Sequence, residues 1–348
     1  MIKYLGSKRT LIPKLLRVVE QLERTESIID LFSGTSRVGH AMKGAGYRVL
    51  SNDHNAYAAL LSRCYVQSDR EDLAEEATEI LKELQATPGK PGYFTETFCI
   101  KSRFFKPKNG EKIDAIREVI AKRDFEPELE AVLLVSLMEA ADRVDSTTGL
   151  QMAYLKKWAA RASKDLELRL PNILPRATHG KSSSHQLDAL TAAKTLHADV
   201  AYLDPPYNQH KYVANYHIWE TLTLWDKPEV YGVACKRVDV RERRSPYNSK
   251  PRAVAALKEV VDALVAPRLI VSFSDEGYIG REDMENMLQS KGHVAVLEND
   301  FKRYVGAQIG IHNPKGKKVG EVSHLRNTEY IYVVSPDIRD VERVMSAF

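Results

Sequence analysis

The chain has 348 residues, with 51 Lys or Arg against 47 Asp or Glu, so its formal net charge at pH 7 is +4. Three widely spaced cysteines, Cys64, Cys99 and Cys235, argue against a disulfide framework and a zinc site, and we expect no metal. The sequence shows neither an apolar leader nor a run of about 18 apolar residues, which predicts a soluble cytoplasmic protein without a membrane partner.

The first 56 residues alternate between helical and strand patterns. Apolar residues at helical spacing predict an amphipathic helix over 11–22, and SIIDLF predicts a buried strand over 27–32. A turn rich in Gly, Ser and Thr follows, and then a helix that ends near Lys43, before Gly44. YRVLSND predicts a second strand over 47–53.

Residues 57–180 differ in character, because charged segments with helical periodicity dominate and strand patterns are scarce. The helical segments are EKIDAIREVIAKR, PELEAVLLVSLMEAADRV and GLQMAYLKKWAARASK. We therefore predict that 57–180 is an inserted helical module, and that 1–56 and 181–348 together form one α/β domain.

Strand patterns return in the last part of the chain, at 199–206 and 268–277. The runs 301–312 and 321–334, joined by the turn-rich NPKGKKVG, predict an antiparallel hairpin. Strands that alternate with helices favour a doubly wound, Rossmann-like sheet that is mostly parallel, to which the hairpin adds an antiparallel edge.

Three predicted strands end at an acidic residue, namely Asp30, Asp53 and Asp204. Ligands of such sheets bind beyond the carboxyl ends of the strands. The turn after Asp30 contains Gly34 and can let a nucleotide-like ligand approach the backbone. Asp53 follows Asp30 by 23 residues, a spacing typical of a carboxylate that binds ribose hydroxyls. These features allow NAD or S-adenosylmethionine, and an ordinary turn with a helix cap is the alternative.

The third strand ends in the rigid sequence Asp204-Pro205-Pro206-Tyr207. Proline has a fixed φ and no amide proton, so this segment leaves the strand as a stiff, extended chain. The sequence therefore predicts an acid and an aromatic ring that are held in fixed positions.

Four motifs occur in an order that resembles the Dam-type (alpha group) N6-adenine DNA methyltransferases: KYLGSK (3–8), DLFSGT (30–35), ND (52–53) and DPPYN (204–208). Further segments resemble the methylases of type II restriction-modification systems: FFKPKNGEKIDAIREVI, ADRVDSTTGLQMAYLKKW, NYHIWETL and KRYVGAQIGIHNPKGKKVG. The first cofactor motif of this family is usually Phe-x-Gly-x-Gly, and Ser36 replaces its second glycine here.

The resemblance implies that S-adenosylmethionine is the cofactor. The Lys8 ammonium would meet the carboxylate of the cofactor, unless it is only a solvated charge. Asp188 would lie near the adenine amino group of the cofactor, unless it is only a helix N-cap. The implied cofactor-binding residues are Tyr4, Gly6, Lys8, Asp30, Phe32, Ser33, Gly34, Thr35, Asp53, Asp188, Ala189 and Asp204.

The resemblance also implies the roles of the segment 204–207. The lone pair of the adenine amino group is drawn into the ring, so two fixed hydrogen-bond acceptors are needed to make the nitrogen nucleophilic. The Asp204 carboxylate and the Pro205 carbonyl would be these acceptors, with Pro206 keeping the segment rigid and Tyr207 stacking on a base flipped out of the duplex.

Positive charge is concentrated in two stretches. Residues 236–252 contain seven basic residues against two acids, and 301–326 contain six against one. Such stretches suit phosphate contacts, and a solvated loop is the alternative for each. The predicted DNA-binding residues are Lys156, Lys157, Lys211, Arg241, Arg243, Arg244, Lys302, Arg303, Lys315, Lys317 and Lys318.

The sequence therefore favours a methyltransferase of the bacterial cytosol or nucleoid that acts on N6 of adenine in double-stranded DNA, as part of a restriction-modification system. We expect a monomer or weak dimer, with a cognate restriction endonuclease as a candidate partner. The alternatives are methylation of cytosine N4 or of ribosomal RNA adenine, and a non-catalytic nucleic-acid-binding subunit. A nicotinamide-dependent oxidoreductase calls for G-x-G-x-x-G, which DLFSGTSRVG does not supply.

Overall fold

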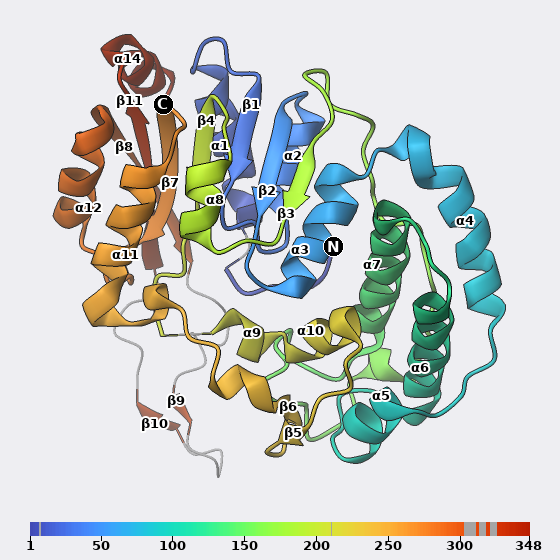
Figure 1. Cartoon of the computed structure of the whole chain (residues 1–348). Coiled ribbons are helices and arrows are strands. Elements are labelled where there is room, and N and C mark those ends of the chain that lie inside the picture. The colour runs from blue at the N-terminus through green and yellow to red at the C-terminus, as the bar shows by residue number, and fades with distance from the viewer. Residues whose placement is uncertain (7, 210, 303–310, 313–317, 321–325) are drawn as a thin grey trace.

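The computed structural model describes residues 1–6, 8–209, 211–302, 311–312, 318–320 and 326–348 and contains a seven-stranded sheet with the order β3-β2-β1-β4-β7-β11-β8 (Figure 1). The strands of this sheet are β1 Ser27–Asp30, β2 Arg48–Asn52, β3 Ser183–His185, β4 Val200–Leu203, β7 Arg268–Ser274, β8 His293–Lys302 and β11 Arg326–Ser335. Two small pairs lie outside it, formed by β5 Val230–Tyr231 with β6 Lys236–Arg237 and by β9 Ile311–His312 with β10 Lys318–Gly320.

The α-helices connect these strands, and α4–α7 lie within residues 57–180. They are α1 Ile12–Glu20, α2 Arg37–Gly44, α3 Ala56–Ser62, α4 Arg70–Ala86, α5 Tyr93–Thr95, α6 Pro107–Lys122, α7 Pro127–Val144, α8 Ala189–Thr195, α9 Tyr212–Asn215, α10 His217–Leu224, α11 Lys250–Ala263, α12 Arg281–Leu288 and α14 Ile338–Ala347. Short helical turns are η1 Lys8–Thr10, η2 Arg63–Gln67, η3 Glu96–Ile100, η4 Ala160–Ser163, η5 Val238–Arg241, η6 Pro246–Asn248 and η7 Gln289–Lys291.

The sheet is parallel from β3 to β7, and β11 runs antiparallel to both β7 and β8. β1 pairs with β2 on one side and with β4 on the other, so the direction of chain progression reverses between β1 and β4. In open α/β sheets, such a reversal leaves a crevice at the carboxyl ends of the strands. The architecture is a mixed α/β fold compatible with the Rossmann-like methyltransferase fold.

Both faces of the sheet are buried under helices. Consecutive strand residues point to opposite sides of the sheet, so each strand contributes to both cores. Ile28 and Val200 pack in the core under α1, α2 and α14, whereas Ile29 and Ala201 pack in the core under α8, α11 and α12. This two-sided burial explains why the strand sequences are continuous apolar runs rather than alternating ones.

The helices α4–α7 lie beside the sheet, next to α3 and α10 (Figure 1). Their apolar core contains Phe94, Ile116 and Leu134, and it also contains Tyr57 of α3 and Trp219 of α10. Residues on both sides of the predicted boundary at 180 therefore share one core. The division of the chain into an α/β domain and an inserted module stays a prediction.

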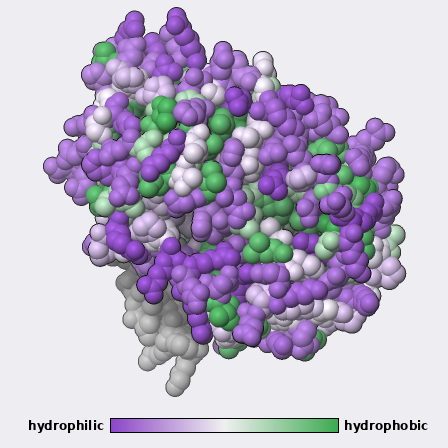
Figure 2. Space-filling view, in the orientation of Figure 1, coloured by the Kyte–Doolittle hydropathy of each residue, from purple (hydrophilic) through white to green (hydrophobic). Residues whose placement is uncertain are grey.

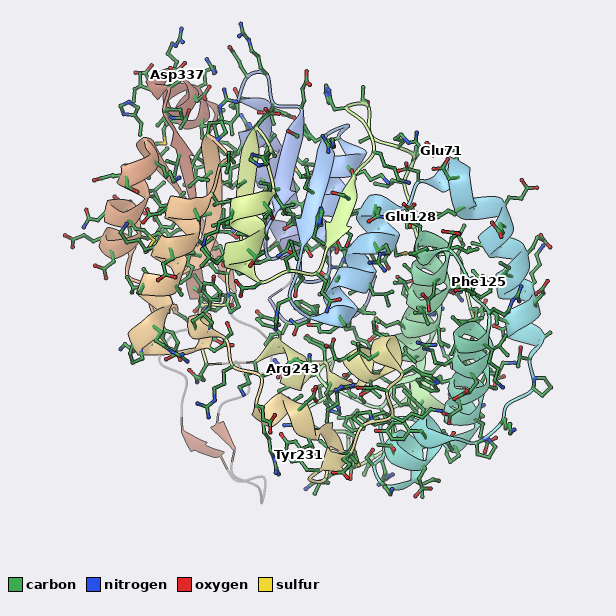
Figure 3. The ribbon with its side chains drawn as sticks, in the orientation of Figure 1. Glu71, Phe125, Glu128, Tyr231, Arg243 and Asp337 are labelled. Carbon is green, nitrogen blue, oxygen red and sulfur yellow. The ribbon has the colours of Figure 1, made fainter. Side chains whose placement is uncertain are left out.

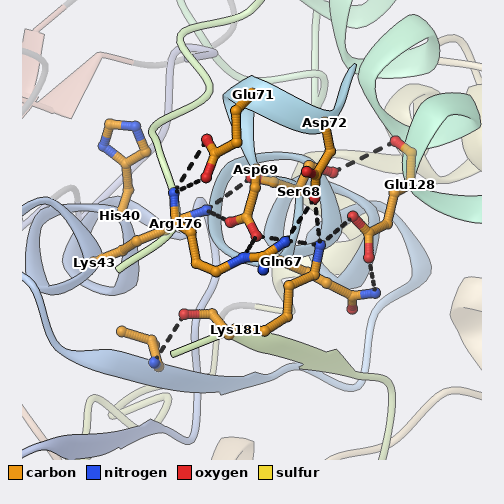
Figure 4. A network of polar contacts seen from close by, with 12 residues as sticks. His40, Lys43, Gln67, Ser68, Asp69, Glu71, Asp72, Glu128, Arg176 and Lys181 are labelled. Atoms are coloured by element: carbon orange, nitrogen blue, oxygen red, sulfur yellow. Dashed lines mark hydrogen bonds and ion pairs between the residues drawn. The ribbon is translucent and has the colours of Figure 1, made fainter. Parts of the chain in front are cut away.

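A buried ion-pair network joins α2 to the beginning of α4 (Figure 4). The Lys43 ammonium donates to Asp69 at 2.8 Å, and both side chains are fully buried. Arg176 donates to the same carboxylate at 2.7 Å, and Lys181 lies 3.4 Å from it. The network fixes the base of the helical part against a helix that packs on the sheet.

The prediction of a helix over 149–164 is wrong, because only η4 at Ala160–Ser163 is helical there. Tertiary hydrogen bonds hold the segment instead. The Asp145 carboxylate accepts from Arg161 at 2.8 Å, and the Ser146 carbonyl accepts from the Leu155 amide at 2.8 Å. These contacts override the helical periodicity of the sequence.

The predicted hairpin is antiparallel in the structure, and its described pairs agree with the prediction: Lys302 of β8 pairs with Arg326 of β11, and His312 of β9 pairs with Lys318 of β10. The start of its first strand differs, because β8 already begins at His293. β8 is favoured because its alternating apolar residues fill both cores, with Ala295 under α14 and Val294 on the opposite face. Residues 303–310, 313–317 and 321–325 of the predicted hairpin lie outside the described residues.

Hydrophilic side chains cover most of the face shown in Figure 2. In the part of the chain that the structure describes, we find no helix that has both the length and the apolar character of a membrane span.

Candidate active site

A cavity of about 200 Å³ opens at the carboxyl ends of β1, β2 and β4, at the reversal point of the sheet. Its lining includes Pro206 and the cations Lys211, Arg243 and Arg244. It also includes all the residues that the sequence predicts for cofactor binding, namely Tyr4, Gly6, Lys8, Asp30, Phe32, Ser33, Gly34, Thr35, Asp53, Asp188, Ala189 and Asp204. Segments more than 200 residues apart in sequence therefore form one surface.

Two glycines near the cavity, Gly34 in the bend after β1 and Gly6 in the N-terminal segment, have backbone conformations that disfavour a side chain. Gly34 has φ +52°, and a Cβ there would lie 3.4 Å from the Tyr4 hydroxyl. Gly6 has φ +72°, and its Cβ would lie 3.3 Å from the Tyr212 hydroxyl. A side chain at either position would be strained and would intrude on the cavity wall.

Ser36 occupies the position at which the family motif has glycine, and its backbone explains that preference. Its φ of 60° and ψ of 20° are left-handed, a conformation that glycine adopts without strain. The Ser36 hydroxyl is buried and has no hydrogen-bond partner among the described residues. The turn thus keeps the backbone of the motif despite the side chain.

Asp30 lies at the end of β1 and is almost fully buried. Its Oδ2 accepts the Gly39 amide of α2 at 3.1 Å, while Oδ1 is buried without a partner among the described residues. Burial raises the pKa of Asp30 to about 7. The cavity floor therefore has an acceptor that no described protein group satisfies.

Asp53 locks the glycine bend to the end of β2. Its Oδ2 accepts the Gly34 amide at 2.9 Å, and its Oδ1 accepts the Asn55 amide at 2.9 Å. Burial raises the pKa of Asp53. The N-cap position of α3 is Asn55, so Asp53 is not that cap.

Asp188 is the N-cap of α8, where its side chain accepts the Leu190 amide at 2.9 Å. It also lines the cavity. The two interpretations of Asp188 from the sequence are therefore compatible.

Asp204 follows β4 and forms an ion pair with Lys8, at 3.0 Å from its Oδ1 to the Lys8 Nζ. The same ammonium donates to Glu329 of β11 at 2.5 Å. Lys8 is only 8% exposed, so the interpretation of Lys8 as a solvated charge is wrong. Both of its anionic partners belong to the protein.

Lys8, Asp204 and Glu329 form a charged triad. Burial and charge together determine the pKa values of Lys8 and Asp204. Burial raises the pKa of Asp204 to about 6, although the neighbouring Lys8 opposes the shift. Burial alone would lower the pKa of Lys8, but Asp204 and Glu329 raise it well above its usual value. Lys8 is therefore cationic at neutral pH, and Asp204 is mostly ionised.

The exit from β4 is held by the neighbouring chain. The Tyr207 carbonyl accepts the Tyr278 amide at 3.0 Å, and the Tyr207 ring packs edge-on against Phe273 with centroids 6.0 Å apart. Pro205 is buried, and neither Pro205 nor Tyr207 lines the main cavity. Of the four residues predicted for catalysis, only Asp204 and Pro206 line it.

Tyrosine rings form one wall of the cavity. The Tyr4 ring stacks on Tyr212 and Tyr216, with centroids 5.4 Å and 4.6 Å apart. The Tyr4 hydroxyl lies 3.3 Å from that of Tyr57. This stack holds the first motif of the chain against α9 and α3.

Basic residues lie at the rim of the cavity. Arg243 pairs with the buried Glu220 at 2.5 Å, and Figure 3 shows it close to α9. Lys211 donates to the Val240 carbonyl at 3.1 Å. Arg244 is exposed and has no hydrogen bond or ion pair to any residue within the described ranges.

The other residues predicted to contact DNA are not part of the cavity lining or lie outside the described residues. The Arg241 guanidinium lies 3.9 Å from the centroid of the Tyr231 ring. Lys156 and Lys157 are exposed. For Lys302 and Lys318, the structure describes only the backbone. Arg303, Lys315 and Lys317 lie outside the described residues.

Sequence reasoning missed several residues of the site. Arg37 lines the cavity from the first turn of α2, and Tyr247 lines it from η6. Glu329 contacts Lys8 from β11, and its only sequence signal is an acid inside the apolar run NTEYIYVV. Among the described residues, no group of three or more His, Cys, Asp or Glu is placed to hold a metal ion.

Comparison with known proteins identifies relatives over most of the chain. The sequence profile of the family described as D12 class N6 adenine-specific DNA methyltransferase matches residues 4–271. The type II methyltransferase M.FokI of Planomicrobium okeanokoites is 30% identical over 99% of this chain and 54% of its own length. M.NlaIII of Neisseria lactamica is 28% identical over 93% of this chain and 98% of its own length. The modification methylase LlaI of Lactococcus lactis subsp. lactis is 26% identical over 92% and 54%.

The chain thus spans about half the length of M.FokI and LlaI and nearly the whole length of M.NlaIII.

Proposed function

The chain belongs to the D12 class of N6 adenine-specific DNA methyltransferases, and from this membership we propose that it transfers a methyl group from S-adenosylmethionine to N6 of an adenine flipped out of duplex DNA. Relatives named as type II methyltransferases and modification methylases support a role in a restriction-modification system. A cognate endonuclease is the partner that this role implies.

The cavity fits the proposed cofactor, because its unsatisfied groups match those of the ligand. Methyltransferases of this family use S-adenosylmethionine in general, and the group supplies a methyl that its sulfonium makes electrophilic. Asp30 Oδ1 lacks a partner among the described residues and can accept a ligand hydrogen bond. We assign Asp53 to the ribose hydroxyls, and Phe32 and Asp188 line the same cavity. Arg37 offers a cation for a carboxylate, since Lys8 already has two anionic partners.

The observation that carries the proposal is the position of Asp204, which lines the same cavity as the glycine bend. Its Oδ1 is held by Lys8, and we assign Oδ2 to the amino group of the flipped base. We assign the second acceptor to the Pro205 carbonyl, which lies between Asp204 and Pro206, although Pro205 itself is outside the cavity lining. Two acceptors would draw electron density back to N6. N6 would then form a C–N bond as the C–S bond of the donor breaks, the bonding pair would stay on sulfur as a neutral thioether, and one N6 proton would be released to water. Fixed geometry matters because a displacement of about 1 Å can cost about a hundredfold in rate.

Rigid contacts support this alignment. The Tyr207 carbonyl is held by Tyr278, and the Asn208 carbonyl accepts from Asn248 at 2.7 Å. We propose that the Tyr207 ring, which packs edge-on against Phe273, stacks on the flipped base. The cations at the rim, with residues 57–180 as the recognition module, would hold the duplex.

Tritiated methyl transfer into DNA and into ribosomal RNA, followed by nucleoside analysis, tests the proposal. N6-methyladenine in DNA is expected. N4-methylcytosine or methylated RNA would establish one of the alternative substrates.

The variant Asp204→Ala tests the role of the carboxylate. It should reduce transfer below detection while the Kd for S-adenosylmethionine, measured by calorimetry, changes less than about threefold. An active variant would refute the assignment of Asp204. A wild-type chain that binds the cofactor but methylates neither nucleic acid would favour the non-catalytic alternative.

A further inference from the structure

Glu329 is a buried acid without a role in the reaction proposed above. It lies in β11 directly opposite Ser274 of β7, and only 4% of it is exposed. A carboxylate at such a depth in a sheet is costly unless it is paired, and Lys8 is its partner. Because β11 is hydrogen-bonded on both sides, the backbone that carries Glu329 is fixed.

Lys8 does not have this support of its own. It lies in the short turn η1, outside the sheet, and its ammonium reaches both Glu329 and Asp204. The sheet can therefore fix the position of the ammonium through Glu329. The ammonium in turn fixes Oδ1 of Asp204.

The charges of the triad also matter. The Lys8 ammonium lies between two carboxylates, so its positive charge is shared between Asp204 and Glu329. If Lys8 faced Asp204 alone, it would neutralise that carboxylate more completely and weaken it as a hydrogen-bond acceptor. The groups around Asp204 from neighbouring elements are Lys8, Asp30, Tyr202, Tyr207, Tyr212, Ser272 and Glu329. Glu329 and Asp30 are the other acids in that set.

We propose that Glu329 is a positioning residue for methyl transfer, which holds the Lys8 ammonium in place and shares its charge so that Asp204 stays a strong acceptor. This inference rests on the proposed function. Glu329 does not touch the base or the cofactor, and it acts through Lys8.

The test compares Glu329→Gln and Lys8→Met by their pH profiles of kcat/KM for DNA methylation. Removing the negative charge of Glu329 should lower the pH at which kcat/KM falls to half on the acid side by on the order of one unit, because Asp204 then has the ammonium to itself. Removing the ammonium should move the same midpoint upward. We also expect Glu329→Gln to lower kcat about tenfold, with little change in cofactor affinity.

The matched control is Glu298→Gln on β8, which removes one negative charge from the neighbouring strand. Glu298 has a side chain that is 57% exposed and pairs with Arg281 instead of Lys8. Its midpoint and kcat should equal those of the wild type.

The outcomes separate this inference from the proposed function. A Glu329→Gln enzyme with a lower rate but an unmoved midpoint would show a merely structural role and would overturn the proposal, as would wild-type kinetics. If the wild type methylates no DNA, the proposed function fails instead. The titration of Asp204 by carboxyl-carbon NMR, assigned with Asp204→Asn, would then still decide whether Glu329 and Lys8 shift it in opposite directions.

Discussion

The carboxyl groups of Asp30, which is buried, and Asp204, which is partly buried, lie at the ends of adjacent strands and differ in their partners. Asp204 has an ammonium 3.0 Å away, whereas Asp30 accepts one backbone amide. Burial raises the pKa of both, to about 6 for Asp204 and about 7 for Asp30. In the proposed reaction, Asp204 is the residue that needs its charge, and it is also the one with a cation beside it.

The role that we propose for Asp204 predicts the pH dependence of methyl transfer. In that role the adenine amino group needs an ionised acceptor, and protonation of Asp204 below its pKa of about 6 removes it. In the free enzyme, kcat/KM should therefore be level above about pH 7 and fall about tenfold per pH unit below 6. Initial rates between pH 5 and pH 8 check this, and a profile that is level down to pH 5 would contradict it.

Ser36 offers a prediction about stability. Replacing it by glycine removes a left-handed strain and a buried hydroxyl without a described partner, so Ser36→Gly should raise the free energy of unfolding by about 1 kcal/mol. Ser62 is the control, because its hydroxyl also lacks a described partner but its φ is −64°. Ser62→Gly should lower the free energy by about 0.5 kcal/mol. Urea unfolding measures both, and a loss of stability in Ser36→Gly would refute the strain argument.

At the scale of elements, buried charge networks connect parts that the sequence separates. The Asp69 carboxylate joins α2, the start of α4 and residues 176–181 (Figure 4). Burial alone would raise the pKa of Asp69, but bonds from Lys43 and Arg176 lower it. Its stabilising effect is therefore present above the unfolded pKa and is lost as the pH falls through the folded value.

Asp69→Asn should lower the free energy of unfolding at pH 7 by about 3 kcal/mol, because it leaves the buried Lys43 without its anion. Asp72 belongs to the same network, but its side chain is 41% exposed. Asp72→Asn should therefore cost less than about 1 kcal/mol. Chemical denaturation of the two variants compares them, and equal losses would mean that burial of the pair is not decisive.

Periodicity predicted the strands β1, β2, β4 and β7 because each is short, apolar and buried on both faces. It failed over 149–164, where hydrogen bonds to Asp145 and Ser146 replace the helix. It also missed residues 293–300 of β8, since the alternating apolar residues from His293 indicate a strand only when both cores are in place. Local pattern decides an element only when tertiary contacts agree with it.

At the scale of the whole molecule, the cavity lies at the reversal point of the sheet and its rim carries cations. Arg243 is tied to Glu220, but Arg244 is exposed and is bonded to no residue in the ranges that the structure covers. Hydrophilic side chains cover much of the face in Figure 2 around the position at which Figure 3 labels Arg243. Arg244 is therefore the rim cation best placed for a DNA phosphate.

Arg244→Ala should weaken binding of duplex DNA and reduce the slope of log K against log salt by about 1, because one phosphate contact is lost. Arg339→Ala on α14 is the control, since Arg339 is an exposed cation paired with Asp337, which Figure 3 shows at the end of the molecule away from Arg243. Fluorescence anisotropy at several salt concentrations gives both slopes. An unchanged slope in Arg244→Ala would exclude that contact.

The sequence by itself determined the family, the central strands and the motif residues that line the cavity, because motif residues and apolar runs are local properties of the chain. Only the tertiary structure decided how Lys8 is used. A carboxylate from β11, more than 300 residues away in the sequence, meets its ammonium only after the sheet is assembled. Pairing, burial and charge balance depend on distances in space, and spacing along the chain does not encode them.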